Sequence, residues 1–141
     1  MGKIQDMATK LRKDGSVEAV EKALLNIVKK NESEALDFNR SQLLGNRDSE
    51  GESLGEYASI AYANKKGSVQ VDLKLTGDFQ KSFFMETDKF PVVFWAKDDK
   101  TEMLTEKYGR EIFGLDKVNK GAFAQGIKSE VQAFYRSLIH V

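Results

Sequence analysis

The side chains best suited to chemistry in this sequence are three acids in one short polar stretch. Asp48, Glu50 and Glu52 alternate within residues 45–53, a run rich in turn-forming residues. Neighbouring carboxylates of this kind serve as metal ligands or as general acids and bases. A small metal-dependent or acid–base enzyme that uses these three residues is therefore one alternative for the function.

Part of the same stretch matches the spacing of a calcium-binding loop. Positions 1, 3, 5 and 6 of that pattern are filled by Asn46, Asp48, Glu50 and Gly51. Position 12, where a calcium loop needs a bidentate glutamate, is Tyr57. The sequence therefore predicts a solvent-exposed loop at 45–53 that holds no calcium.

Other catalytic signatures are missing from the sequence. It contains no glycine-rich phosphate loop, no Gly-x-Ser-x-Gly elbow and no His-Glu-x-x-His pair. It has no cysteine, and its one histidine is His140, so thiolate sites and histidine clusters are excluded. We expect a protein that is not an enzyme and has no cofactor.

Composition narrows the class of partner. The 141 residues include 22 basic and 22 acidic side chains, so the formal net charge is zero and the sequence makes no strong case for nucleic-acid binding. No apolar run approaches the roughly 20 residues of a membrane span, and the N-terminus lacks a secretory signal. We expect a protein of the cytoplasm or of a larger particle, without a membrane partner.

The elements that position these side chains are organised around residues 69–96. Apolar and polar residues alternate over 69–75, which predicts a strand, and Thr76-Gly77-Asp78 interrupts the pattern. Five of the nine phenylalanines and the only tryptophan fall in this stretch, so the core should form here. We expect Phe94 and Trp95 to lie on opposite faces of one strand within 92–96, with at least one deeply buried.

Helical patterns flank this stretch. Apolar spacing predicts helices at 4–13 and 17–30 with a break at Asp14-Gly15-Ser16, and a short edge strand at 38–43. Asp99 and Glu102 have capping-box spacing for a helix that Gly109 can close. Asp116 or Asn119 begins a last helix, whose apolar stripe is Phe123, Ile127, Val131, Phe134 and Leu138.

The predicted fold is α+β in a single domain, 1–141. A small antiparallel sheet is covered by a long N-terminal helix pair and a C-terminal helix. The stripe Ile4, Met7 and Leu11 faces away from the stripe of the second helix, so residues 1–14 are expected to be a mobile or partner-docking helical arm.

Several segments between about 42 and 115 resemble small structural proteins of tailed bacteriophages and prophages. They include Leu54-Gly55, Val71-Asp72-Leu73, Thr76-Gly77-Asp78-Phe79, Lys81-Ser82-Phe83, Lys107-Tyr108-Gly109 and Ile112-Phe113-Gly114-Leu115. The turn at Thr76-Gly77 is similar to one in the tail-completion, or head-tail joining, family. Phe79 and Gln80 depart from that family, which usually has leucine and arginine there.

This resemblance implies a virion component at the head-tail junction or tail, with protomers arranged as a homo-oligomeric ring among other virion proteins. It implies the virion as location, and the host cytoplasm during assembly. The expected contact elements are the arm, the acidic loop 45–53 and the basic turn Lys65-Lys66, because opposite charges on neighbouring protomers help to fix register. A cytoplasmic binding module unrelated to phage is a further alternative.

Overall fold

The computed structural model describes residues 17–57, 63–64, 66, 70–74 and 77–139. The predicted helix 4–13, with Ile4, Met7 and Leu11, lies outside the described residues. The rest of the predicted arm 1–14 and Lys65 also lie outside them.

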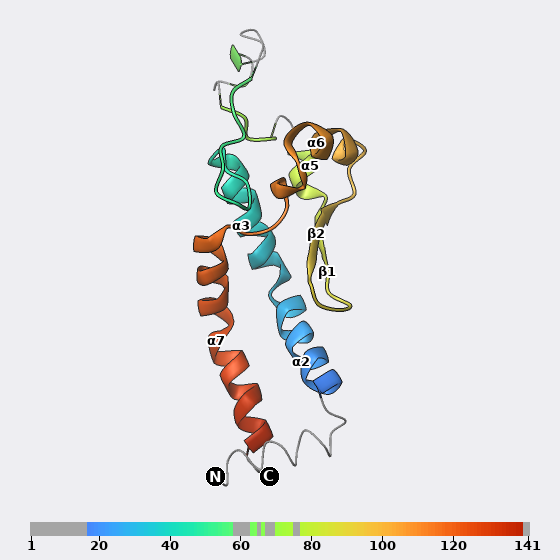
Figure 1. Cartoon of the computed structure of the whole chain (residues 1–141), viewed down its shortest axis with the longest axis vertical. Coiled ribbons are helices and arrows are strands. Elements are labelled where there is room, and N and C mark those ends of the chain that lie inside the picture. The colour runs from blue at the N-terminus through green and yellow to red at the C-terminus, as the bar shows by residue number, and fades with distance from the viewer. Residues whose placement is uncertain (1–16, 58–62, 65, 67–69, 75–76, 140–141) are drawn as a thin grey trace.

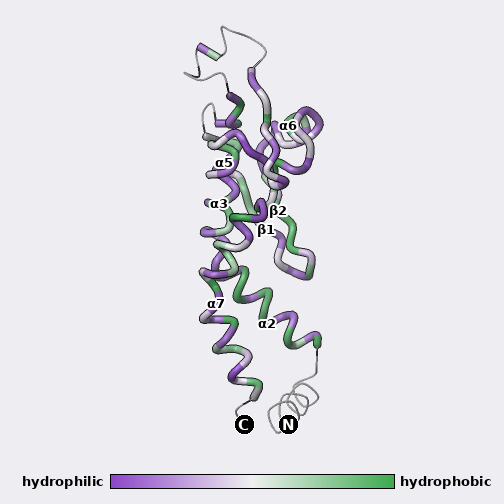
Figure 2. Tube along the Cα trace, turned by 60° about the vertical axis from the view of Figure 1, so that its left-hand side comes forward, coloured by the Kyte–Doolittle hydropathy of each residue, from purple (hydrophilic) through white to green (hydrophobic). Residues whose placement is uncertain are grey.

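Three long helices form the body of the molecule, which is elongated (Figure 1). Helix α2 is Val17–Lys30, α3 is Glu32–Leu44, and α7 is Lys117–Ile139. The predicted helix 17–30 is confirmed. Helix α3 continues upward from α2 in Figure 1, and α7 runs back along both in the opposite direction. Apolar and polar residues alternate along α2 and α7 in Figure 2, as expected of helices with one packed face.

Asn31 marks the break between α2 and α3. Its side-chain nitrogen donates to Ile27 O at 2.8 Å and to Glu130 Oε1 on α7 at 3.1 Å. Asn31 thus joins the first two helices to the last.

Asp116 starts α7, since its carboxylate accepts a hydrogen bond from Asn119 N at 2.8 Å, the geometry of an N-cap. The predicted start of the last helix is therefore confirmed.

A two-stranded antiparallel sheet packs beside α3, which makes the fold α+β as predicted. Strand β1 is Phe83–Glu86 and β2 is Val93–Ala96. Phe83 pairs with Ala96 and Met85 with Phe94. Shorter helices surround one end of the hairpin: α5 at Asp78–Lys81, α6 at Thr101–Tyr108, and the 3-10 helix η1 at Arg110–Ile112.

Two predicted strands are wrong. Residues 38–43 belong to α3, where Asn39 and Gln42 are buried and bonded to the 112–116 segment. Residues 70–74, the described part of the predicted strand 69–75, form only an isolated bridge between Gln70 and Glu56. Leu73 has a φ of 60°, a left-handed conformation that no regular strand contains.

The predicted cap of α6 is also wrong. The N-cap residue is Lys100, and its side chain makes no capping hydrogen bond. The Lys100 N–H donates to Asp98 Oδ1 at 2.8 Å. The closing glycine is confirmed. Gly109 has a φ of 88° and donates its N–H to Thr105 O at 2.8 Å, a conformation that favours glycine.

The core is built from aromatic rings brought together by β1, α5 and the segment after η1. Phe113 lies with its ring centroid 5.2 Å from that of Phe83 and 6.0 Å from that of Phe79. Trp95 packs against Phe113 with centroids 5.0 Å apart. Phe94 and Trp95 are both half-buried, so the prediction that one of them is deeply buried is wrong, and Phe113 is the more enclosed ring.

None of the helices in the described part of the chain is long and apolar enough to cross a membrane.

Candidate functional site

Asp48 organises the acidic loop. Its carboxylate oxygen Oδ1 accepts hydrogen bonds from the backbone N–H groups of Glu50 and Glu52, both at 2.9 Å. Asp48 is buried, whereas the side chains of Glu50 and Glu52 are exposed. The three predicted acids therefore lie close together in the chain, but one carboxylate builds the turn while the other two project from it.

The calcium-loop pattern serves a different purpose. Asn46 donates from Nδ2 to Val71 O at 2.7 Å and to Gly55 O at 2.8 Å, so this side chain holds two segments of backbone together. The hydroxyl of Tyr57 lies 3.3 Å from Asp72 Oδ1. Among the described residues, no three His, Asp or Glu side chains are grouped closely enough to hold a metal ion.

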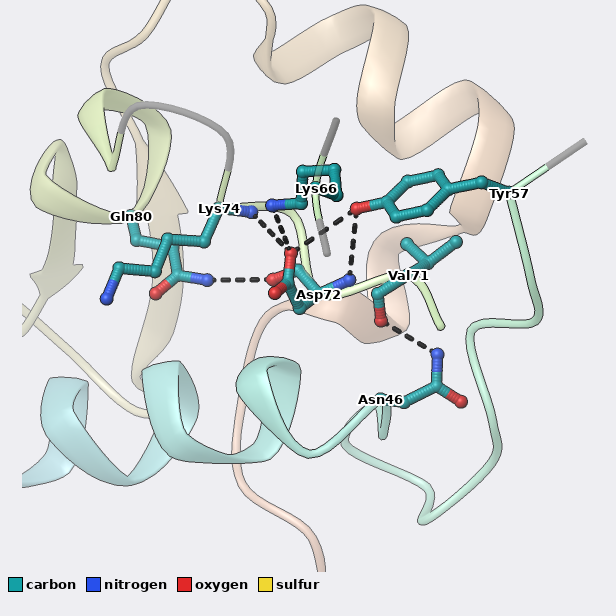
Figure 3. Close-up of polar contacts among 7 residues, drawn as sticks. All are labelled: Asn46, Tyr57, Lys66, Val71, Asp72, Lys74 and Gln80. Atoms are coloured by element: carbon teal, nitrogen blue, oxygen red, sulfur yellow. Dashed lines mark hydrogen bonds and ion pairs between the residues drawn. The ribbon is translucent and has the colours of Figure 1, made fainter. Parts of the chain in front are cut away.

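Lys66, predicted to contact a neighbouring protomer, forms an ion pair within the chain. Its Nζ lies 2.7 Å from Asp72 Oδ1, and its side chain is only 5% exposed (Figure 3). Lys74 N donates to the same carboxylate at 3.0 Å. Lys66 thus connects to Asp72 instead of presenting a free basic surface.

The pKa of Asp72 is lower than its ordinary value. Burial disfavours the charged carboxylate and by itself raises the pKa. The hydrogen bonds from Lys66, Lys74 N and Tyr57, together with the positive charge of Lys66, outweigh that burial. The ionised form of Asp72 is therefore the form that fits the fold.

This cluster is tied to α3 through Gln80. Gln80 donates from Nε2 to Asp72 O at 2.9 Å (Figure 3). The backbone carbonyl of Gln80 accepts a hydrogen bond from Arg40 Nε at 2.8 Å. Sequence reasoning missed this cluster because Asp72 was placed on the solvent face of a strand. No local signal in the sequence distinguishes an outward-facing Asp72 from one that turns inward to a buried lysine.

An apolar pocket of about 490 Å³ lies under the inner face of the hairpin. This volume is in the range of sites that bind small molecules. Its apolar lining includes Val28, Ala35, Met85, Val92, Phe94 and Phe123. Ser49, Glu50 and Lys120 are polar residues in its lining, so Glu50 is the one predicted site acid that the fold places here.

No protein-family profile, curated protein or solved structure matches this chain.

Proposed function

We propose that the protein is a structural component of a phage or prophage particle, at the head-tail junction or tail. It acts by self-association and by binding neighbouring virion proteins. The sequence resemblance across 42–115 supports this assignment of class, and the apolar surface of the long helices supports the mode of action.

The observation that carries the proposal is how little of α2 and α7 is fully buried. In α2 only Leu25 is buried, and among the described side chains of the 23-residue α7 only Leu138 is. The remaining stripe of α7 is half-buried: Phe123, Ile127, Val131 and Phe134. Large apolar side chains that one chain covers incompletely are typical of subunits that are completed by a partner.

Isolated large apolar side chains are also exposed on three separate elements. Val17 at the start of α2 is 65% exposed, Leu44 at the end of α3 is 46% exposed and Met103 on α6 is 58% exposed. The elements that carry them are distributed along the length of an elongated molecule (Figure 1). This distribution favours several contacts with neighbours over one closed interface.

Deleting the gene in its source replicon and imaging the particles that are produced tests this proposal. We expect heads and tails that fail to join, or tails whose ends are defective. Supplying the gene in trans should restore infectivity. Particles of normal form and infectivity, or flanking genes that encode no virion protein, would overturn it.

The pocket under the hairpin favours a second candidate, a binding module unrelated to phage. A pocket lined by Met85, Phe94 and Phe123 suits an apolar ligand, with Lys120 available for a negative group. Titration with a fluorescent apolar anion, such as an anilinonaphthalene sulfonate, tests it at native pH. Saturable one-site binding that Val92→Trp abolishes supports this candidate, and the absence of saturable binding removes it.

A further inference from the structure

On the outer edge of β2, Phe94 has backbone groups without a hydrogen-bond partner among the described residues. Lys97 N donates to Ser82 O at 3.2 Å, so residues 82 and 97 are a hydrogen-bonded pair of the antiparallel ladder. Because such pairs alternate with non-bonded pairs, Met85 and Phe94 form a non-bonded pair. The Met85 N–H donates to Glu32 Oε1 at 2.9 Å and therefore points away from β2, as expected for a residue of a non-bonded pair.

It follows that the N–H and C=O of Phe94 point away from β1. Among the described residues neither group has a hydrogen-bond partner. The corresponding edge of β1 is protected, because α3 packs beside it and Glu32 accepts the Met85 N–H. The edge of β2 lies on the far side from α3 and carries only the uncharged residues Val93, Phe94, Trp95 and Ala96.

An edge of this kind is a template for another strand. Natural sheets protect such edges with charges, proline or a covering element. β2 has no charge along its four residues; Thr101 Oγ1 donates to the C=O of Ala96 at 3.3 Å, whereas Phe94 has no such partner among the described residues. A hairpin of two strands is also only marginally stable by itself, whereas a wider sheet is more stable.

The charges at the two ends of β2 indicate which strand fits. Asp88-Lys89 precedes the strand and Asp99-Lys100 follows it. Asp88 and Lys89 lie in the bend before β2, and Asp99 and Lys100 lie in the turn after it. If two copies of β2 pair antiparallel about Phe94, the bend of each copy lies beside the turn of the other, so acidic and basic side chains meet at both ends of the contact. The same arrangement moves Phe90, which is 46% exposed, toward the α6 end of the second copy, where Met103 is exposed.

We propose that β2 pairs with β2 of a second copy of this chain, which joins two hairpins into one four-stranded antiparallel sheet. The two Phe94 residues exchange N–H···O=C bonds, so the contact is isologous and each copy satisfies the other. This inference deepens the self-association in the proposed function and rests on that part of it. It makes a dimer the unit from which larger assemblies are built.

Amide hydrogen exchange of the full-length wild-type protein, followed by NMR at several concentrations, tests the contact. We expect the Phe94 amide to slow by at least about tenfold as the chain dimerises, because a free edge N–H exchanges rapidly and a paired one does not. The Val118 amide, at the exposed first turn of α7, is the internal control and should not change.

Light scattering on the same samples gives the oligomeric state. A chain that stays monomeric up to millimolar concentration overturns the proposal. A dimer in which the Phe94 amide remains unprotected overturns it as well, because the chain then associates through another surface.

Cysteine crosslinking gives a second test, since the chain has no native cysteine. Phe94→Cys should form an interchain disulfide on mild oxidation, because paired residues of neighbouring antiparallel strands are within disulfide range. Val118→Cys is the matched control and should form no interchain disulfide, although it should still dimerise through β2. Equal crosslinking of the two variants contradicts the proposal, and the wild-type exchange experiment decides the matter if Phe94→Cys does not fold.

These outcomes are separable from the gene deletion. Protection of Phe94 together with normal particles leaves the dimer in place and removes the virion role. An unprotected Phe94 together with defective particles does the reverse.

Discussion

Lys66 and Asp72 form the most enclosed ion pair in the described part of the chain. The side chains are 5% and 24% exposed, whereas Asp37, in its pair with Arg40, is 73% exposed. Removing one partner of an enclosed ion pair destabilises the fold, because the other charge is then left away from water without an opposite charge beside it. Lys66 was expected from sequence to act at a subunit interface, whereas Asp72 was not singled out, and the fold pairs the two within one chain.

Asp72→Asn should therefore reduce the free energy of unfolding by about 2 kcal/mol. This is less than for a fully buried pair because the carboxylate keeps 24% of its exposure. The measurement is urea denaturation at pH 7. Asp37→Asn removes the exposed pair with Arg40 and is the control, with an expected loss below about 0.5 kcal/mol. Equal losses for the two variants would show that Asp72 has no special role.

Acid should remove the contribution of Asp72. Its pKa is lowered in the folded state from the ordinary 3.8, so its stabilisation is fully present above that value and is lost as pH falls through the folded pKa. Wild type and Asp72→Asn should thus differ in unfolding free energy at pH 6, and the difference should shrink as the pH falls below 3.8 and through the lowered pKa of Asp72. A difference that stays constant from pH 6 to pH 2 would contradict this assignment.

At the scale of elements, local patterns predicted the helices better than the strands. The helix 17–30, the start of the last helix at Asp116 and the closing Gly109 depend on spacing and capping within a few residues, which the sequence displays directly. The segment 38–43 was misread because Asn39 and Gln42 are polar yet buried. Their burial is explained only by contacts more than 70 residues away in the chain.

These contacts attach the 112–116 segment to α3. Asn39 donates to Ile112 O at 2.9 Å and accepts from Gly114 N at 3.1 Å, with its side chain fully buried. Asn39→Ala leaves both backbone groups without this partner, and should cost about 2 kcal/mol in thermal or urea unfolding. Ser41→Ala, at an exposed site on the same helix, should stay within about 0.5 kcal/mol of wild type. A neutral Asn39→Ala would mean that water replaces the amide without loss.

The candidate site was predicted less well than the fold. Glu50 does line the pocket, but the pocket itself depends on the hairpin, α2 and α7 meeting in space, which no spacing of acids reveals. The cluster at Asp72 depends on Leu73 adopting a left-handed conformation inside an alternating sequence. Alternation favours a strand only when neighbouring strands are present to pair with it, and residues 70–74 have none beyond one bridge.

Across the whole molecule the core is small and lies at one end of the helical body. Phe113 joins Phe79, Phe83 and Trp95 there, so Phe113→Ala should cost about 4 kcal/mol. Phe94→Ala, at the half-buried wall of the pocket, should cost about 2 kcal/mol. Denaturant unfolding of both variants measures which substitution lowers the free energy of unfolding more. A larger loss at Phe94 would move the centre of the core to the pocket side of the hairpin.

Assembly is expected to use two kinds of contact with different symmetry. Pairing through β2 is isologous and closes after two copies, whereas an arm that reaches a neighbouring subunit is heterologous and can continue around a ring. The stripe Ile4, Met7 and Leu11 is the predicted arm contact, and helix-in-groove docking is a common use of such a stripe.

Deleting residues 2–13 should therefore leave the melting temperature nearly unchanged, because the described core lies in residues 25–138. The truncated chain should still form dimers with a protected Phe94 amide. It should fail to form larger assemblies in light scattering or crosslinking with its natural partners present. Substituting Ile4, Met7 and Leu11 together by serine in the full-length chain is the matched variant and should have the same effect. If truncation unfolds the isolated chain, the arm belongs to the core of its own subunit, and the ring contact must be made by another surface.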